Sequence, residues 1–204
     1  MPRIFWAHLL ILSSAAVVAN YCPEHCSCKW KGGKETVACS KNASMAALPT
    51  HLDPDTQVLS INGNFFSTLG TSAFLSIGLP NLQKIFLSEC SVSKVERGAF
   101  RGLTNLVELD LSKNALSRFP TFTAADCRHL MRLDLRGNSM IKDIPSGSFD
   151  ALADLVHLDL SECAIETISD TSGLANLNSL EQLELGNNRL TFIDPVKTLP
   201  STLR

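Results

Sequence analysis

The feature that most constrains the fold is an eleven-residue pattern that returns along the chain at a nearly constant interval. Its clearest copy is LVELDLSKNAL, with leucines at Leu106, Leu109, Leu111 and Leu116 and an asparagine at Asn114. We call the position of Asn114 the marker. The six marker residues along the chain are Asn64, Cys90, Asn114, Asn138, Cys163 and Asn188. The steps between markers are 26, 24, 24, 25 and 25 residues, so the chain contains six copies of one unit.

The residues five and three places before each marker are apolar in all six copies. They are Leu59 and Ile61, Ile85 and Leu87, Leu109 and Leu111, Leu133 and Leu135, Leu158 and Leu160, and Leu183 and Leu185. Alternation with period two over so short a run predicts a strand with one face inward. Each unit is too small to bury its own apolar side and must stack on its neighbours. The pattern therefore predicts one parallel sheet with a shared core.

The repeated pattern resembles the leucine-rich repeat, whose period is about 20 to 29 residues. The resemblance implies an α/β-type solenoid: a leucine-rich repeat horseshoe with a parallel concave β-sheet and an irregular or 3-10 convex side. Phenylalanines recur at similar offsets in the returning segments and predict a stacked aromatic column in the core. They are Phe66, Phe74, Phe100, Phe119 and Phe149.

The N-terminal residues have the features of a signal peptide. Arg3 precedes an apolar run from Ile4 to Leu12, and Val17 to Ala19 supplies small and apolar residues before a cut ahead of Asn20. A membrane anchor is the alternative, but a spanning helix needs about 20 apolar residues. We therefore predict a signal peptide over residues 1–19, and a secreted or extracellular chain with no membrane span once it is removed. The alternative is a cell-surface location, if a C-terminal membrane segment is missing from the sequence.

Four cysteines follow closely: Cys22, Cys26, Cys28 and Cys39. In an oxidising compartment such a group predicts two disulfides, and the spacing alone allows three pairings. A zinc site with four thiolates is the alternative, but the spacing lacks the paired CxxC motifs that such sites favour. Gly32-Gly33 between polar and β-prone residues predicts a two-residue turn, and hence a hairpin that covers the open end of the first repeat.

This cysteine segment resembles the N-terminal cap of extracellular leucine-rich repeat proteins, which implies the pairs Cys22–Cys28 and Cys26–Cys39. The stretches CKWKGGKETVAC, DPDTQVL, NLQKIFL and GLTNLVELDLS are similar to parts of the insect Kekkon family. Members of that family are transmembrane proteins with leucine-rich repeats and an immunoglobulin domain, acting in adhesion or signalling, including through growth-factor receptors. The resemblance implies a protein ligand or a receptor ectodomain as partner.

The Kekkon pattern continues through a C-terminal cysteine cap, an immunoglobulin domain and a membrane span, which this sequence lacks up to Arg204. We therefore expect a truncated product, or a partner that covers the last repeat. The expected divisions are a cap over 20–55, six repeats over 56–200 and the start of a further repeat over 201–204. A single sequon begins at Asn42, and we predict that it is glycosylated; an unoccupied sequon is the alternative.

Because side chains alternate across a strand, the residues between the buried leucines are predicted to point outward onto the concave face. This candidate protein-binding face comprises Lys84, Phe86, Glu108, Asp110, Arg132, Asp134, Arg136, His157, Asp159 and Glu184. Four successive carboxylates run from Asp110 to Glu184, and we expect Arg132, Arg136 and His157 to offset part of their repulsion. These carboxylates either bind a partner with a basic or hydrogen-bonding surface, or serve only to keep the strands soluble.

Several other classes of function find no support in the sequence. A net charge of -2 gives no basic face for nucleic acid. No catalytic, nucleotide-binding or metal-binding motif is present, so we predict no enzyme activity, cofactor or metal. Cys127 lies near His129, but nothing else suggests a nucleophile, and we predict a partly buried free thiol.

The function predicted from the sequence is therefore extracellular protein binding that modulates cell-surface receptor signalling or adhesion. The alternatives are a secreted matrix protein and a non-functional partial gene product.

Overall fold

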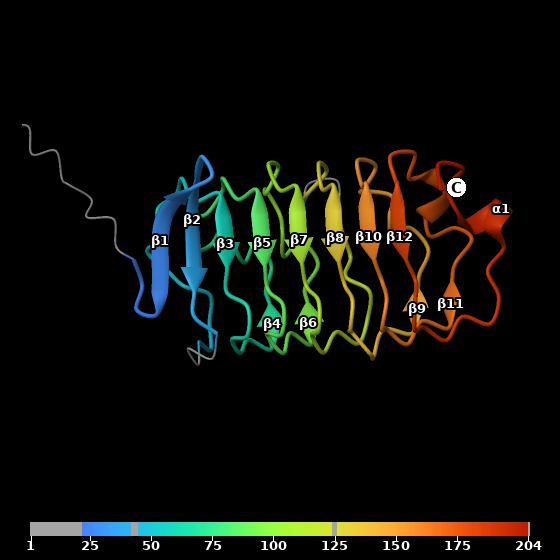
Figure 1. The fold of residues 1–204 in the computed structure, drawn as a ribbon, viewed down its shortest axis with the longest axis horizontal. Coiled ribbons are helices and arrows are strands. Elements are labelled where there is room, and N and C mark those ends of the chain that lie inside the picture. Colours follow the sequence, from blue (N-terminus) through green and yellow to red (C-terminus); the bar gives the residue numbers. More distant parts are fainter. Residues whose placement is uncertain (1–21, 42–44, 124–125, 204) are drawn as a thin grey trace, which may run out of the picture.

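The computed structural model describes residues 22–41, 45–123 and 126–203. The predicted signal peptide over 1–19 and the sequon at Asn42 lie outside the described residues. The chain forms one eight-stranded main sheet (Figure 1). After each strand of a repeat, a returning segment carries the chain back to the start of the next strand of this sheet. Its strands, in spatial order, are β1 (Cys26–Lys31), β2 (Lys34–Cys39), β3 (Val58–Ser60), β5 (Lys84–Phe86), β7 (Glu108–Asp110), β8 (Arg132–Asp134), β10 (His157–Asp159) and β12 (Gln182–Glu184).

The main sheet is parallel from β2 to β12, and only the first hairpin is antiparallel. Neighbouring repeats pair without any shift of register, so the apolar residue at the centre of each strand stands beside its equivalent. The row is Val37, Leu59, Ile85, Leu109, Leu133, Leu158 and Leu183. All but Leu183 are buried. The predicted solenoid with one parallel sheet is confirmed.

The hairpin of β1 and β2 turns at Gly32 and Gly33, whose φ values are 58° and 76°. Glycine adopts this left-handed region without the steric penalty that a Cβ would impose. The hairpin joins the main sheet through β2 and places Val37 of that strand beside Leu59 of the first repeat. The predicted N-terminal hairpin cap is thus confirmed, and it extends the sheet beyond the first repeat.

An aromatic column runs through the core, but its members differ from the predicted ones. Phe74 stacks on Phe100 with ring centroids 5.8 Å apart, and Phe100 stacks on Phe122 at 5.9 Å. Phe119 lies edge-on to both Phe122 and Phe149, at 6.3 Å and 5.1 Å. The prediction missed Phe122 because it stands eight residues after its marker, whereas Phe74 and Phe100 stand ten after theirs.

The returning side is mostly irregular and includes a 3-10 helix, η1 (Leu174–Asn176), as predicted. It also contains two small parallel ladders: β4 (Thr68–Leu69) with β6 (Lys94–Val95), and β9 (Asp143–Ile144) with β11 (Thr167–Ile168). A four-residue helix, α1 (Pro195–Thr198), follows the last repeat, and Asp194 caps its N-terminus. Within the described ranges, no helix is long and apolar enough to cross a bilayer.

The marker asparagines hold consecutive repeats together by hydrogen bonds. The Asn138 amide donates to Leu135 O of its own repeat at 2.7 Å and to Leu111 O of the preceding repeat at 3.0 Å. Its Oδ1 accepts the N–H of Leu116, also in the preceding repeat, at 3.2 Å. Asn114 and Asn188 make equivalent bonds. Buried polar groups of the bend are thereby satisfied without water.

Cys90 and Cys163 replace the marker asparagine and preserve part of this pattern. The Cys90 thiol donates to Ile61 O of the preceding repeat at 3.3 Å, and the Cys163 thiol donates to Leu135 O at 3.4 Å. A thiol lacks the Oδ1 of asparagine, which accepts a backbone N–H of the preceding repeat at the other markers. That N–H must therefore donate to another group. Phe66 N donates to Cys90 O at 3.0 Å instead. Both thiols are buried and free, which agrees with a structural role.

Replacing Asn138 with alanine is expected to lower the free energy of unfolding by roughly 2 to 4 kcal/mol, because two buried carbonyls and one N–H lose their partner. Urea denaturation of the purified chain measures this change. Asn178→Ala is the matched control, since Asn178 is exposed, and should shift stability by less than about 0.5 kcal/mol. Equal effects of the two changes would contradict the role of the asparagine bonds.

Candidate protein-binding face

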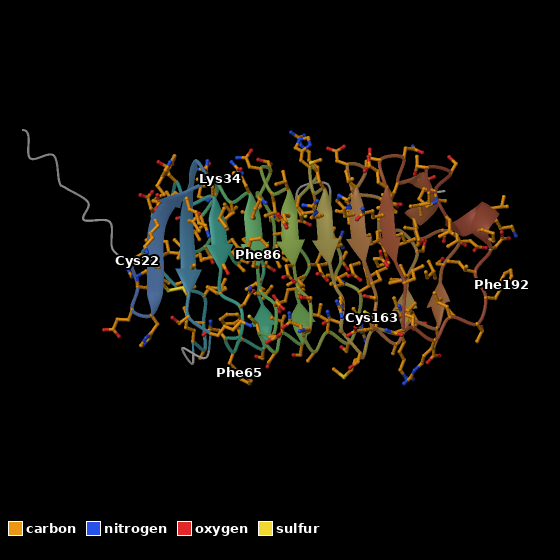
Figure 2. All side chains as sticks on the ribbon, in the orientation of Figure 1. Cys22, Lys34, Phe65, Phe86, Cys163 and Phe192 are labelled. Carbon is orange, nitrogen blue, oxygen red and sulfur yellow. A yellow bond between two sulfur atoms is a disulfide. The ribbon has the colours of Figure 1, made fainter. Side chains whose placement is uncertain are left out.

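The strands from β5 to β12 present two rows of side chains on the outside of the main sheet, which we call the sheet face. Pairing in register fixes both rows. The first row is Lys84, Glu108, Arg132, His157 and Gln182, and the second is Phe86, Asp110, Asp134, Asp159 and Glu184. The central leucine of each strand is turned to the other side, into the core. Figure 2 labels Phe86 on β5 within this sheet.

Charges in the first row partly pair with one another. Lys84 Nζ lies 2.6 Å from Glu108 Oε2, and the two side chains are only about one-third and one-fifth exposed. His157 Nδ1 lies 2.8 Å from Gln182 Oε1. Arg132 stands between Glu108 and His157 and is exposed. The row therefore offers a cation, Arg132, at its centre.

In the second row, three aspartates accept a backbone N–H from the bend that follows their strand. The contacts to the carboxylate Oδ1 are Ser112 N to Asp110 at 2.8 Å, Arg136 N to Asp134 at 2.9 Å, and Ser161 N to Asp159 at 2.8 Å. Such local bonds are typical of aspartate at turns. The hydrogen bond to the bend is therefore by itself a reason for aspartate at these positions, whether or not a partner also binds there. In the β5 repeat, where Phe86 takes this place, Ser88 N donates to Asn62 Oδ1 at 2.8 Å.

Asp134 stands at the centre of the second row of the sheet face. Burial raises the pKa of its carboxyl to about 6, and the charges of Asp110 and Asp159 on the adjacent strands act in the same direction. The bond from Arg136 N opposes the rise but does not cancel it. Burial, reinforced by the like charges on the adjacent strands, therefore leaves Asp134 able to take up a proton in mildly acidic solution.

Arg136 is the one predicted face residue that lies outside the two rows, in the bend after β8. Its guanidinium contacts Glu162 of the next repeat, with Nη2 and Nε at 2.5 Å and 3.1 Å from Oε1. This hydrogen bond raises the pKa of Arg136, and the charges of Asp159 and Asp134 have a smaller effect in the same direction. We expected Arg136 to offset part of the repulsion in the carboxylate row, and its charge does lower the pKa of Asp134, although its principal hydrogen-bond partner is Glu162.

The sheet face is hollowed at its centre. A hollow of about 220 Å³ is lined by both rows from β5 to β12, including Phe86, Asp134 and Glu184. A smaller hollow of about 140 Å³ lies beside it at the N-terminal ends of the strands, where Val107, Met131 and Val156 add apolar surface. Sequence reasoning missed these three residues, although each stands seven places before its marker. The combined surface has charged, hydrogen-bonding and apolar parts.

The cap cysteines lie on β1 and β2 or just before β1, at the N-terminal end of the main sheet and outside the strands of the sheet face; Figure 2 labels Cys22 at that end. Disulfides join Cys22 to Cys28 and Cys26 to Cys39. These are the pairs that the resemblance to extracellular caps implies. Both bridges tie β1 into the cap: the second joins the paired residues at the ends of β1 and β2. Two disulfides of this kind each stabilise a domain by about 2 to 4 kcal/mol.

Cys127 and His129 do not form a catalytic pair. Cys127 is fully buried, whereas we had predicted a partly buried thiol, and burial raises the pKa of that thiol to about 12. His129 is exposed, and its Nδ1 contacts Asp154 Oδ2 at 2.8 Å. A thiol so far from ionisation is a poor nucleophile. Among the described residues, no group of three potential metal-binding side chains comes together.

Asp134 should titrate near pH 6 in the folded protein, because burial raises its pKa from the ordinary 3.8. The folded state then binds more protons than the unfolded state between these values, so this group lowers the free energy of unfolding as pH rises from 4 to 6. Asp134→Asn should therefore gain stability relative to the wild type on going from pH 4 to pH 7.

Carboxyl-carbon NMR gives the midpoint, and urea denaturation at the two pH values gives the stability difference. Glu24→Gln changes an exposed carboxylate of the cap and should differ from the wild type by less than about 0.5 kcal/mol at either pH. A midpoint for Asp134 near its ordinary value would contradict the account of this row.

The chain shares its repeats with known proteins. The sequence profile described as "Leucine rich repeat" matches residues 54–122 and 128–190. Similar proteins are "Leucine-rich repeat-containing protein 3" of Danio rerio, 32% identical over 120 residues (58% of this chain, 44% of that protein), "Reticulon-4 receptor-like 2" of Homo sapiens, 35% over 106 residues (52% and 24%), and "Lumican" of Oryctolagus cuniculus, 32% over 154 residues (75% and 74%).

The chain spans less than half the length of the first two of these relatives and about three quarters of Lumican. The matched profile covers most of the described repeats, from before β3 to beyond β12. The matched profile, the in-register parallel strands and the asparagine bonds between repeats all indicate the same repeat. The chain belongs to the leucine-rich repeat family.

Proposed function

We propose that this protein works outside the cell by binding another protein through the sheet face. The observation that carries the proposal is the hollow on that face, where Phe86, Arg132 and five carboxylates are held by paired strands. These side chains lie outside the core, and although three of the aspartates also accept a backbone N–H of the bend, their charges remain available for recognition. Solenoid repeats commonly present such a surface to partners. Binding, rather than catalysis, is the activity that these groups support.

An extracellular location is supported by the two disulfides of the cap. Such bonds persist in oxidising compartments and are rare in the cytosol. The signal-peptide features of residues 1–19 support the same proposal from the sequence. We further propose that residues 20–55 form the cap and 56–200 the repeats, and that Asn42 carries a glycan.

The partner that we propose is the ectodomain of a cell-surface receptor or adhesion protein. The resemblance of the cap segment CKWKGGKETVAC to the Kekkon family supports this choice. The chemistry of the sheet face defines the partner further. The acidic second row, with Phe86 at its edge and Arg132 beside it in the first row, favours a partner surface that is mainly basic, with an apolar contact opposite Phe86.

The triple variant Asp110→Asn, Asp134→Asn and Asp159→Asn tests the sheet face. Asparagine keeps an oxygen that can accept the N–H of the bend, so the fold is retained while three charges are removed. The tetramerised protein is applied to an array of purified receptor and adhesion ectodomains and to purified fibrous matrix proteins. We expect wild-type binding to at least one ectodomain, and at least about a tenfold loss in the variant.

The control variant is Asp53→Asn with Asp194→Asn. These aspartates also accept a backbone N–H two residues ahead, at 2.8 Å and 3.0 Å, but neither lies in the rows of the sheet face. The control should bind as the wild type does. Undiminished binding by the triple variant would remove the carboxylate row from the proposal, and binding to matrix proteins alone would favour a structural role in the matrix.

A further inference from the structure

The small ladders on the returning side are interrupted at the third repeat. β4 pairs with β6 and β9 pairs with β11, but no strand is present between β6 and β9 in the described part of the third repeat. Figure 1 shows the four short strands along one margin, with the gap between β6 and β9. This margin is distinct from the strands that carry the sheet face.

Pro120 explains why the ladder stops. In the second repeat, Glu96 N donates to Leu69 O of the first repeat at 2.9 Å. Glu96 stands six places after its marker, and Pro120 stands six places after Asn114. Proline has no N–H and cannot make the corresponding bond to Val95 O. The third repeat therefore cannot continue the ladder beyond β6.

The open edge of β6 consists of the N–H and C=O groups of Val95. In β6, the N–H groups of Lys94 and Glu96 point to the first repeat, where they donate to Ser67 O and Leu69 O. Alternate residues of a parallel strand pair with opposite neighbours, so Val95 presents its N–H and C=O to the third repeat. Within the described residues, no backbone hydrogen bond joins Val95 to 117–121. Such an unpaired edge can accept an added strand.

A hollow of about 770 Å³ lies between β6 and the 117–121 segment of the third repeat. Its apolar lining comes from Val95, Leu116, Phe119 and Pro120, and Phe119 is held in place by its contact with Phe149. We call this hollow the β6 groove. It places free space directly beside the unpaired backbone of Val95.

The rim of the β6 groove is mainly basic. Lys94, Arg97 and Arg118 line it together with one acidic residue, Glu96. Glu96 is neutralised by Lys94, whose Nζ lies 3.1 Å from Oε1. Arg97 and Arg118 are exposed, and neither makes an ion pair with a described residue. Two unpaired guanidinium groups therefore flank the groove.

We propose that the β6 groove binds an extended acidic peptide of a partner protein, which pairs with Val95 as an added strand and places carboxylates against Arg97 and Arg118. The unpaired backbone edge selects an extended peptide, because a peptide supplies the alternating N–H and C=O groups of a ladder. The guanidinium groups select carboxylates, with which they form paired hydrogen bonds. This site is additional to the function proposed for the sheet face and does not depend on it.

The experiment measures fluorescence anisotropy of a labelled ten-residue peptide of alternating glutamate and valine, titrated with the full chain. We expect saturable binding that Arg118→Glu weakens by at least about tenfold, since it reverses a charge on the rim. Arg128→Glu is the matched control: it is an exposed arginine of the same repeat outside the groove, and it should bind as the wild type does.

Two further ligands separate strand addition from simple charge attraction. The same peptide is also methylated on alternate backbone nitrogens, in each of the two registers. The register whose methyl groups face Val95 keeps its carboxylates but loses the N–H that would donate to Val95 O, so it should bind at least about tenfold more weakly, whereas the other register should bind as the unmodified peptide does. A sulfated heparin octasaccharide should not displace the unmodified peptide. The proposal would be overturned if both methylated peptides bound as tightly as the unmodified peptide. Displacement of the unmodified peptide by the octasaccharide, or an unchanged affinity of Arg118→Glu for that peptide, would overturn it too.

Discussion

Hydrogen bonds from the marker side chains to the neighbouring repeat are the interaction on which the rest of the structure depends. A leucine-rich repeat buries its apolar residues only by stacking, and stacking also buries the polar backbone of each bend. Asn114, Asn138 and Asn188 satisfy that backbone in their own repeat and in the preceding one. The same bonds fix the spacing and register of the strands, which no single repeat could determine alone.

This register gives the outer side chains their arrangement. Because no strand shifts relative to its neighbour, residues at one offset from the marker form continuous rows on the sheet face. The aspartates of the second row serve two purposes there: they accept the N–H of the following bend, and they concentrate negative charge. Burial raises the pKa of Asp134, the charges of the neighbouring aspartates add to the rise, and the bond from the bend offsets only part of it.

Much of the fold follows from the sequence because the repeats impose it. Period and alternation predict the parallel sheet and the buried row from Leu59 to Leu158, and a pair of glycines predicts the cap hairpin. The residues in the rows of the candidate face follow from the same alternation. Other features could not be predicted because they depend on contacts between repeats that do not recur with the repeat period. Arg136 binds Glu162 of the next repeat, and Phe122 enters the aromatic column from an irregular offset. Cys127 is wholly buried. The gap after β6 comes from a single proline.

Hydrogen–deuterium exchange of the amides of Val92, Leu116 and Ile165 measures whether the marker asparagines hold neighbouring repeats together. Each of these N–H groups donates to the marker asparagine of the following repeat, at 2.9 Å, 3.2 Å and 3.0 Å. We expect these amides to exchange as slowly as those of Leu109 and Leu133 in the main sheet, because opening any of them requires separating two repeats. Exchange as fast as that of the exposed bend residues Ser139 and Met140 would contradict this expectation.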